Sequence, residues 1–517
     1  MQRAPRQAAE ARRHGSFGII RTSASPRLRR SVHLWLFLVA AGCARHAAPI
    51  RTPTPPALAP VQQLEHDLTA ITQRPGVQRG TWGVAVASID RGDRLFELRP
   101  RALLVPASTA KLVSVAAAAD AVGWDYRYAT TLEAGGPIVD GVLHGDLMVS
   151  GSGDPSIGGR GGDDLTSWID ALRGLGIRRI DGRIIGDDDA IDEPRAGFAW
   201  AWDDLGYQTG ALFGALNYAE NRMTVRITPG AAEGEPTTIF VEPWAIDRPL
   251  KDRALTGAAA SSQLLWPEQR PGEPVLTLAG SIPVGARPAT LLVSAGNPTL
   301  WFASVLRHRL IDAGILVSGN AVDIDDVQVD RTSFTTIFTY RSHPLAEIVR
   351  PLLKDSINLY AEAMLRLNTA PGVFPTNDAA LDALKQRLAR WNVPAEGEQL
   401  VDGSGLSRRD VIAPDTLVAI LTRMHDASDT SPWMTALPIA GVDGSLANRM
   451  KGTPAEGNVR AKTGTMSNIR SLAGYVTTRD GEHLAFAIML NDFEGTGAAA
   501  VQAIDAMAIR LAEFSRK

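Results

Sequence analysis

Hydrophobic positions near the start of the chain recur with the spacing of a helix and then of strands. The residues at helical spacing are Val61, Leu64, Leu68 and Ile71. Apolar runs over 82–89 and 95–98, separated by a turn at Arg91-Gly92-Asp93, predict a β-hairpin. The start of the chain therefore predicts a helix followed by two paired strands.

The end of the chain repeats this arrangement in the reverse order. Apolar runs over 471–478 and 484–490 flank a turn at Asp480-Gly481, and a helical pattern covers 498–514. Strands and a helix from each end can build one antiparallel sheet between helices. The predicted fold class is therefore α/β of the α+β type.

The middle of the chain, residues 128–337, differs from both ends in its glycine-rich turns. The elements expected there are strands over 146–150 and 223–227 and helices near 164–174 and 298–314. This length suffices for two small domains. We expect them to be inserted, rich in strand, into a discontinuous domain made of 61–127 and 338–517.

Composition indicates a globular protein and excludes one class of partner. The chain has 517 residues, of which 45% are hydrophobic and 21% charged, with a net charge of -3. Nucleic-acid binding requires a basic stripe or patch that this balance does not supply. We expect no nucleic-acid partner.

The first 43 residues resemble an export signal. Arginines precede the short apolar run 32–41, which ends at Ala40-Ala41-Gly42-Cys43. The run is too short to span a bilayer. We expect export to the periplasm or cell envelope, either with lipidation of Cys43 or with cleavage that discards it. The proline-rich stretch 44–60 predicts a tether, so the membrane would be contacted only through a lipid anchor.

Candidate chemistry begins with Ser108-Thr109-Ala110-Lys111, at the start of an alanine-rich helical pattern. A serine and a lysine one helical turn apart share a face, so a neutral lysine amine could take the serine proton. Only seven of the 53 basic residues are lysines. Arginine cannot lose its proton in a protein whereas a buried lysine can, and Lys111 and Lys462 fit such a role.

Two further motifs follow along the chain. Lys462-Thr463-Gly464-Thr465 lies on a predicted strand, where the glycine would let a ligand approach the backbone closely. Ser356-Ile357-Asn358 precedes a helical pattern; Ser318-Gly319-Asn320 matches the same Ser-x-Asn spacing equally well but is less favourably placed. The order Ser-x-x-Lys, Ser-x-Asn, Lys-Thr-Gly is the signature of penicillin-binding proteins and serine β-lactamases.

The chain resembles the D-alanyl-D-alanine carboxypeptidase and endopeptidase family, the low-molecular-mass class C penicillin-binding proteins. The resemblance covers about residues 62–515. Further similar stretches are Ser150–Pro155, Asp402–Ser407 and Leu437–Leu446. It implies the penicillin-binding serine transpeptidase/β-lactamase-like fold, and the long separation of Lys111 from Ser356 fits this family's inserted domains better than the compact β-lactamases.

The resemblance implies a serine D-Ala-D-Ala carboxypeptidase, a D,D-endopeptidase or both, acting on peptidoglycan stem peptides and acylated by β-lactam inhibitors. Implied catalytic residues are Ser108 (nucleophile), Lys111 (general base), Ser356 (proton relay), Asn358 and Lys462. Implied substrate-binding residues are Thr463, Gly464 and Thr465. The backbone N–H groups of Ser108 and Thr465 would form the oxyanion hole. Burial and the like charge of Lys462 would have to lower the pKa of Lys111.

Other functions stay open or are disfavoured. A β-lactamase, or a cell-wall binding protein that has lost activity, would share the fold. The chain has no Gly-x-Ser-x-Gly or His-Glu-x-x-His motif, and its nine histidines form no metal-like cluster. We therefore expect no metal and no cofactor. Asp154 could lie near the stem peptide or simply accept hydrogen bonds in a turn, and the loop at Asp402 could support the site or only turn the chain.

Overall fold

The computed structural model describes residues 58–517, apart from residue 161 and the segments 193–195, 244–247, 271–272 and 426–429. The predicted signal segment, Cys43 and most of the tether lie outside these residues. Within the described part of the chain, no helix is both long and apolar enough to cross a membrane. Export and lipidation therefore stay predictions.

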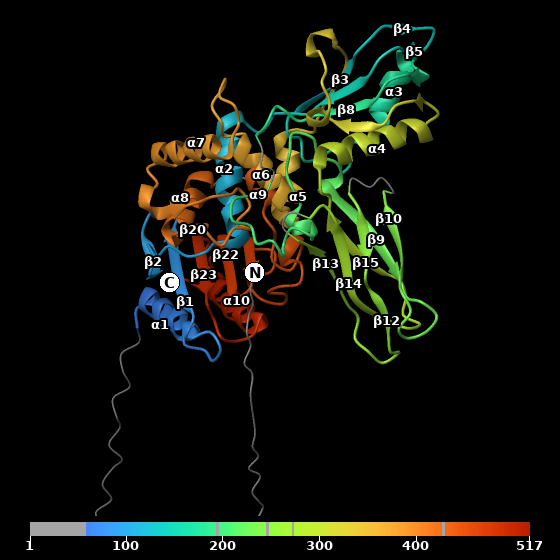
Figure 1. The fold of residues 1–517 in the computed structure, drawn as a ribbon. Coiled ribbons are helices and arrows are strands. Elements are labelled where there is room, and N and C mark those ends of the chain that lie inside the picture. Colours follow the sequence, from blue (N-terminus) through green and yellow to red (C-terminus); the bar gives the residue numbers. More distant parts are fainter. Residues whose placement is uncertain (1–57, 161, 193–195, 244–247, 271–272, 426–429) are drawn as a thin grey trace, which may run out of the picture. The chain divides into compact units, whose positions relative to one another are not determined.

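Strands from both ends of the chain form one five-stranded antiparallel sheet, in the order β2, β1, β23, β22, β21 (Figure 1). The bounds are Thr81–Ser88 for β1, Arg94–Leu98 for β2, Arg460–Met466 for β21, Ile469–Thr477 for β22 and His483–Asn491 for β23. β1 pairs with β23 along its full length, from Thr81 opposite Asn491 to Ser88 opposite Leu484. The two predicted hairpins therefore lie side by side, and β21 forms an edge of the sheet.

The strands alternate between two hydrophobic cores, as the period of two requires. In β1, Val84 and Val86 belong to the core shared with α1 (Pro60–Thr72) and α10 (Gly497–Glu513). Ala85 belongs instead to the core shared with α8 (Pro414–Met424). The helices predicted at the two chain ends thus cover the same face of the sheet together.

Helix α2 (Lys111–Val122) is packed on all sides. It contacts α8 together with α5 (Leu345–Asp355) and α6 (Asn358–Arg366). Every residue from Lys111 to Ala119 is buried. A helix that is apolar all round is a core helix, and its alanines allow the neighbouring helices to approach closely. Lys111, at its first turn, is therefore placed out of bulk water.

The middle of the chain forms further sheets around its own core, which contains Trp168 and Trp301. One five-stranded sheet has the order β17, β8, β6, β3, β18 and packs against α4 (Pro298–Asp312). Its strands are β3 (Ala129–Ala134), β6 (Leu147–Ser150), β8 (Ile184–Asp187), β17 (Ala321–Asp323) and β18 (Thr335–Arg341). A three-stranded sheet consists of β10 (Thr238–Glu242), β9 (Arg222–Thr228) and β15 (Ala289–Ser294).

Local elements of the middle segment agree with the sequence patterns. The expected strands at 146–150 and 223–227 correspond to β6 and β9, and the expected helices correspond to α3 (Thr166–Gly174) and α4. The boundary predicted at residue 337 falls inside β18, which pairs with β3. The division into domains stays a prediction.

Candidate active site

Ser108 lies in a short 3₁₀ turn that leads directly into α2. The turn begins at Ala107, whose φ of 48° is left-handed, a conformation that a side chain bears only where its surroundings hold it. Thr109 Oγ1 and Ser471 Oγ both donate to the carbonyl oxygen of Pro106, at 2.8 and 2.7 Å. These bonds tie the turn to β22. Ser108 thereby sits at the start of α2, where the helix dipole favours negative charge.

The amine of Lys111 is held by three oxygen atoms. Its Nζ lies 2.9 Å from Ser108 Oγ, 2.6 Å from Asn358 Oδ1 and 2.6 Å from the carbonyl oxygen of Ser404. The amide of Asn358 has a defined orientation because its Nδ2 donates to the carbonyl oxygen of Thr209 at 2.7 Å. The amine is therefore fixed against the serine hydroxyl.

The two active-site lysines differ in what controls their pKa. Burial lowers the pKa of Lys111 to about 8, while the negative charges of Asp402, Glu362 and Asp410 act in the opposite direction. The pKa of Lys111 is lowered by burial, as expected, but the expected effect of the charge of Lys462 on Lys111 is not among its causes. Burial and then the charge of Lys111 hold the pKa of Lys462 well below its usual range. Lys462 gives up its charge more readily because no carboxylate counteracts its burial.

Ser356 connects the second motif to the third. It lies between α5 and α6 with a left-handed φ of 63°, so the chain turns sharply at the hydroxyl-bearing residue. Lys462, which is 0% exposed, donates from Nζ to Ser356 Oγ at 2.8 Å and to the carbonyl oxygen of Thr463 at 2.8 Å. Ser356 Oγ is thus within proton-transfer distance of the buried amine.

Gly464, the glycine of the Lys-Thr-Gly motif, makes room for another part of the chain and not for a ligand as expected. A Cβ on Gly464 would come within 2.0 Å of Ser471 Oγ and 2.6 Å of the carbonyl oxygen of Pro106. Gly464 therefore admits the turn that carries Ser108, whereas the sequence suggests that it admits a ligand. Gly405 has the same role on another side, since its Cβ would meet the carbonyl oxygen of Ala107 at 2.0 Å.

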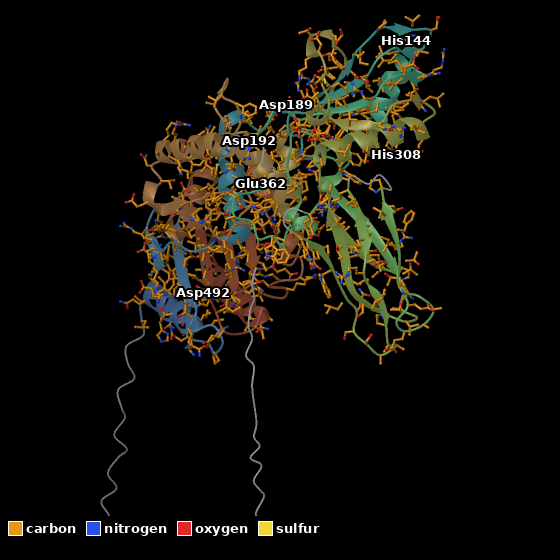
Figure 2. All side chains as sticks on the ribbon, in the orientation of Figure 1. His144, Asp189, Asp192, His308, Glu362 and Asp492 are labelled. Atoms are coloured by element: carbon orange, nitrogen blue, oxygen red, sulfur yellow. The ribbon has the colours of Figure 1, made fainter. Side chains whose placement is uncertain are left out.

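Three buried carboxyl groups shape the loop that supplies the Ser404 carbonyl. Asp402 accepts from the backbone amides of Ser404, Gly405 and Ser407, at 3.0, 2.6 and 2.8 Å. Glu362, which lies among the helices around α2 (Figure 2), accepts from the amide of Gly403 at 3.2 and 3.1 Å. Asp410 accepts from the amide of Val401 at 2.7 Å. The loop at Asp402 therefore supports the site and does not merely turn the chain.

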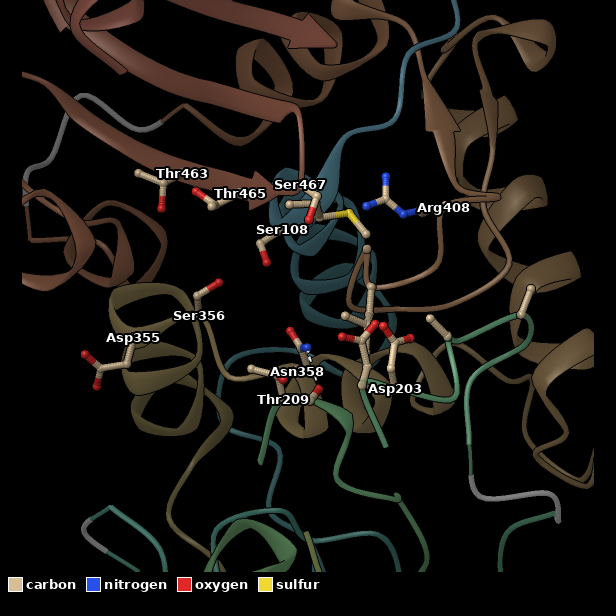
Figure 3. Close-up of a pocket in the computed structure, with 16 residues that line it drawn as sticks. Ser108, Asp203, Thr209, Asp355, Ser356, Asn358, Arg408, Thr463, Thr465 and Ser467 are labelled. Atoms are coloured by element: carbon tan, nitrogen blue, oxygen red, sulfur yellow. Dashed lines mark hydrogen bonds between the residues drawn. The ribbon is translucent and has the colours of Figure 1, made fainter. Parts of the chain in front are cut away.

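A pocket of about 530 Å³ lies beside Ser108 (Figure 3). Of the residues predicted from sequence, Ser108, Ser356, Asn358, Thr463 and Thr465 line it. Gly464, Lys111 and Lys462 are not among the lining residues, and the two lysines are buried. Ser108 is therefore accessible to a substrate in the pocket, whereas the amines of Lys111 and Lys462 are buried beneath the pocket wall.

Charged residues lie at both ends of the pocket. Thr463 and Asp355 lie on one side of Ser108, and Asp203 and Arg408 lie on the other (Figure 3). Burial and the neighbouring charge of Asp203 raise the pKa of Asp204, which also lines the pocket, while Arg408 acts in the opposite direction. The sequence motifs do not single out these residues, because their segments are brought to Ser108 only by the fold.

Asp154 has the turn role that its sequence context allows. It is 1% exposed and accepts from the backbone amide and hydroxyl of Ser156, at 2.8 and 2.6 Å. Burial raises its pKa to about 6. Asp154 is not among the residues that line the pocket at Ser108.

The arrangement of Ser108, Lys111, Ser356, Asn358 and Lys462 can be compared with known proteins. The family model of the D-Ala-D-Ala carboxypeptidase 3 (S13) family matches residues 64–514. The chain belongs to the S13 family. The match spans all three motifs and the long segment between the first and the second.

Two relatives match most of the chain. The D-alanyl-D-alanine carboxypeptidase of Actinomadura sp. strain R39 is 34% identical over 466 residues, which cover 88% of this chain and 85% of the relative. The D-alanyl-D-alanine carboxypeptidase DacB of Haemophilus influenzae is 25% identical over 431 residues, which cover 80% and 85% of the two chains.

The fold agrees with that of a solved penicillin-binding protein. The crystal structure of penicillin-binding protein 4 from H. influenzae superposes with a TM-score of 0.75 at 25% identity, covering 86% of this chain and 99% of the other. A structure of that protein in complex with a β-lactam gives a TM-score of 0.71. The predicted penicillin-binding fold, with an antiparallel sheet flanked by helices and strand-rich insertions, is confirmed.

Proposed function

We propose that this protein is a serine D,D-peptidase that hydrolyses the D-alanyl bond of peptidoglycan stem peptides through an acyl–Ser108 intermediate. The observation that carries the proposal is the set of partners of Lys111. Two of its three oxygen partners, Asn358 Oδ1 and the Ser404 carbonyl, can only accept hydrogen bonds. The third, Ser108, can donate.

A neutral amine has two protons to donate and one lone pair. When the protons point to Asn358 and Ser404, the lone pair faces Ser108 Oγ at 2.9 Å. The neutral form of Lys111 is thus oriented as a general base toward the hydroxyl of Ser108. With a pKa of about 8, a usable fraction of Lys111 is neutral near pH 7.

Acylation then follows with each proton accounted for. Lys111 takes the proton of Ser108, whose Oγ bonds to the carbonyl carbon of the penultimate D-alanine. The backbone N–H groups of Ser108 and Thr465 stabilise the oxyanion. As the C–N bond breaks, Ser356 passes a proton to the leaving nitrogen and is replenished by Lys462, 2.8 Å away. Water then hydrolyses the ester.

The terminal carboxylate of the substrate is assigned to the end of the pocket near Thr463. Thr463 Oγ1 lies 2.8 Å from Ser445 Oγ, so two hydroxyl groups can face a carboxylate together. An arriving carboxylate would also favour the protonated form of Lys462, whose pKa is held low in the free protein. Substrate binding would therefore protonate Lys462, which supplies the proton that the leaving nitrogen receives through Ser356.

Family membership supports this assignment. Relatives are named D-alanyl-D-alanine carboxypeptidases, and the H. influenzae penicillin-binding protein 4 has been crystallised with a β-lactam. We accordingly propose that β-lactams acylate Ser108 by mimicking the terminal dipeptide. Two alternatives are a β-lactamase, which would release the acyl group rapidly, and a protein of the same fold without activity.

Product analysis tests the activity. A soluble pentapeptide ending in D-Ala-D-Ala should lose one D-alanine in the presence of the protein, as measured by mass spectrometry. The Ser108→Ala variant should lose this activity by at least about a thousandfold, because it lacks the nucleophile. Thr109→Ser, which keeps a hydroxyl at the neighbouring position, is the matched control and should stay active. An active Ser108→Ala protein would refute the mechanism.

We further propose that the protein acts outside the cytoplasm, where peptidoglycan lies, and that Cys43 carries a lipid. The Ala40-Ala41-Gly42-Cys43 sequence after an apolar run supports this. The full-length protein, expressed in a Gram-negative host, should partition with the membrane fraction, and Cys43→Ser should move it to the soluble fraction. Unchanged partition of Cys43→Ser would defeat the lipid anchor.

A further inference from the structure

The carbonyl oxygen that holds the Lys111 amine belongs to a peptide group whose orientation is fixed from its other side. The C=O of Ser404 and the N–H of Gly405 share one planar trans peptide, so they point in opposite directions. The N–H of Gly405 donates to Asp402 Oδ1 at 2.6 Å, and the carbonyl oxygen of Ser404 lies 2.6 Å from Lys111 Nζ. The group that holds the carboxylate of Asp402 therefore sets the direction of the carbonyl that faces the amine.

The carboxylate of Asp402 is held in part by a residue of the middle segment. Asp402 is 1% exposed, and its Oδ2 accepts from Trp200 Nε1 and from the amide of Ser407, each at 2.8 Å. The amides that bond to Asp402 come from the same loop, whereas Trp200 lies 202 positions away in the chain. A carboxylate bonded through both oxygens cannot rotate without losing bonds. The indole N–H of Trp200 therefore ties the loop to the middle segment.

Trp200 reaches Asp402 from the wall of the pocket without lining the pocket itself. The alanines on either side of Trp200 are lining residues, whereas Trp200 is partly buried and is not among them. Gly197 packs against the edge of the indole, since a Cβ on Gly197 would come within 2.1 Å of Trp200 Nε1. A change at either position can therefore disturb the bond to Asp402 without removing a group that lines the pocket.

We propose that Trp200 is a positioning residue for the general base: its indole N–H holds Asp402, and the Ser404 carbonyl then keeps the Lys111 amine aimed at Ser108. This inference rests on the proposed function and deepens it by adding a residue of the middle segment to the acylation machinery. Trp200 takes no part in the proton transfer, in which the proton of Ser108 still passes to Lys111.

Loss of the indole N–H has two effects on Lys111, because the peptide after Ser404 is then free to tilt. The neutral amine loses an acceptor that orients its lone pair, so acylation slows at every pH. The charged amine loses a stronger, charge-assisted bond, so the pKa of Lys111 falls. The other groups that influence this charge stay in place: the carboxyl groups of Asp402, Glu362 and Asp410 and the amine of Lys462.

Trp200→Phe tests this role, because phenylalanine keeps an aromatic ring but has no N–H group. The maximum rate of acylation by a chromogenic β-lactam should fall about fivefold to tenfold. The acidic limb of the pH profile should move toward lower pH by roughly 0.3 to 1 unit. A merely structural role would lower the rate equally at every pH and leave the limb where it is.

Trp202→Phe is the matched control, since it is the same change two positions along the chain. Trp202 is 52% exposed and does not line the pocket, and its indole N–H makes no hydrogen bond with the residues that the structure describes. This variant should acylate within about twofold of the wild-type rate. Gly197→Ala keeps Trp200 but places a Cβ 2.1 Å from its Nε1, so it should displace the indole and reproduce both changes of Trp200→Phe.

The outcomes separate this inference from the proposed function. Slower acylation with a displaced limb, absent from Trp202→Phe, supports the positioning role. If Trp200→Phe stays within twofold of the wild type, slows equally at every pH, or slows no more than the control, the role is refuted and the proposed function stands. If Trp200→Phe does not fold, as judged by urea denaturation, Gly197→Ala decides by the same criteria. A wild-type protein that no β-lactam acylates would defeat the proposed function itself.

Discussion

At the scale of single residues, the sequence motifs identify the groups that react but miss those that hold them. Ser108, Lys111 and Lys462 could be found because the reactions need a hydroxyl and an amine at set spacings. The carbonyl oxygen of Ser404, 2.6 Å from Lys111 Nζ, has no sequence signature, because every residue carries a carbonyl. Glu362 was missed for a related reason, since a glutamate in a helical pattern ordinarily faces solvent.

Residue-scale electrostatics predict the pH dependence of the reaction. Lys111 acts as a base only when neutral, so kcat/KM should rise with pH up to about 8 and fall about tenfold for each pH unit below that value. When it is ionised, Glu362 favours the charged form of Lys111, and burial raises the pKa of Glu362 itself to about 7. Glu362→Gln should therefore lower the pKa of Lys111 and move the part of the acidic limb above about pH 7 toward lower pH by roughly 0.5 to 1 unit.

Rates of acylation by a chromogenic β-lactam between pH 5 and pH 9 measure this shift. Glu97→Gln removes a charge from an exposed glutamate on β2 and should leave the profile unchanged. A Glu362→Gln limb that moves toward higher pH, or does not move, would contradict the electrostatic role of Glu362. A merely structural role would lower the rate at every pH without displacing the limb.

At the scale of elements, the active site depends on how closely β21 packs against the turn before α2. The sequence predicts both elements, but it does not predict that Gly464 lies at their contact and lets them pack closely. That contact joins residues more than 350 positions apart, as the hydrogen bond between Ser471 and Pro106 illustrates. Local periodicity carries no information on such pairs, so the role of the glycine could be assigned only from the structure.

A glycine substitution tests this packing. Gly464→Ala places a Cβ 2.0 Å from Ser471 Oγ, so strand and turn must separate. We expect the free energy of unfolding to fall by about 1 to 3 kcal/mol, as for other overpacked cores, and β-lactam acylation to slow at least about tenfold because the oxyanion donors move apart. Urea denaturation and stopped-flow acylation measure the two effects.

The matched control for that substitution is Gly174→Ala. Gly174 ends α3, and a Cβ there meets nothing within 4 Å, so its stability should stay equal or rise slightly. If Gly464→Ala acylates at the wild-type rate with unchanged stability, β21 and the turn do not constrain one another as the structure implies.

At the scale of the whole molecule, the chain ends were more predictable than the middle. Hairpins and helices near each end are local patterns, and joining them into one sheet needs only that both have an apolar face. The two ends of the middle segment are joined by the pairing of β3 with β18, which places residues 129–134 beside residues 335–341. Neither strand pattern contains a signal for its partner, which explains why the predicted boundary at 337 cuts through β18.

The whole-molecule arrangement also explains how the middle segment contributes to the site. The carbonyl oxygen of Thr209 accepts from Asn358, and Asp203 and Asp204 line the same pocket as Ser108. These residues come from the segment between the first two motifs. The middle segment therefore supplies part of the pocket wall in addition to its own core.

The central claim is that Ser108 is the acylated nucleophile of a serine D,D-peptidase, and mass spectrometry of a penicillin-treated protein tests it most directly. The intact protein should gain the mass of one penicillin molecule, with the adduct persisting for minutes or longer, and peptide mapping should place it on Ser108. Ser108→Ala should gain no mass. A stable adduct on another residue, or none on the folded wild-type protein with no β-lactam turnover, would contradict this account.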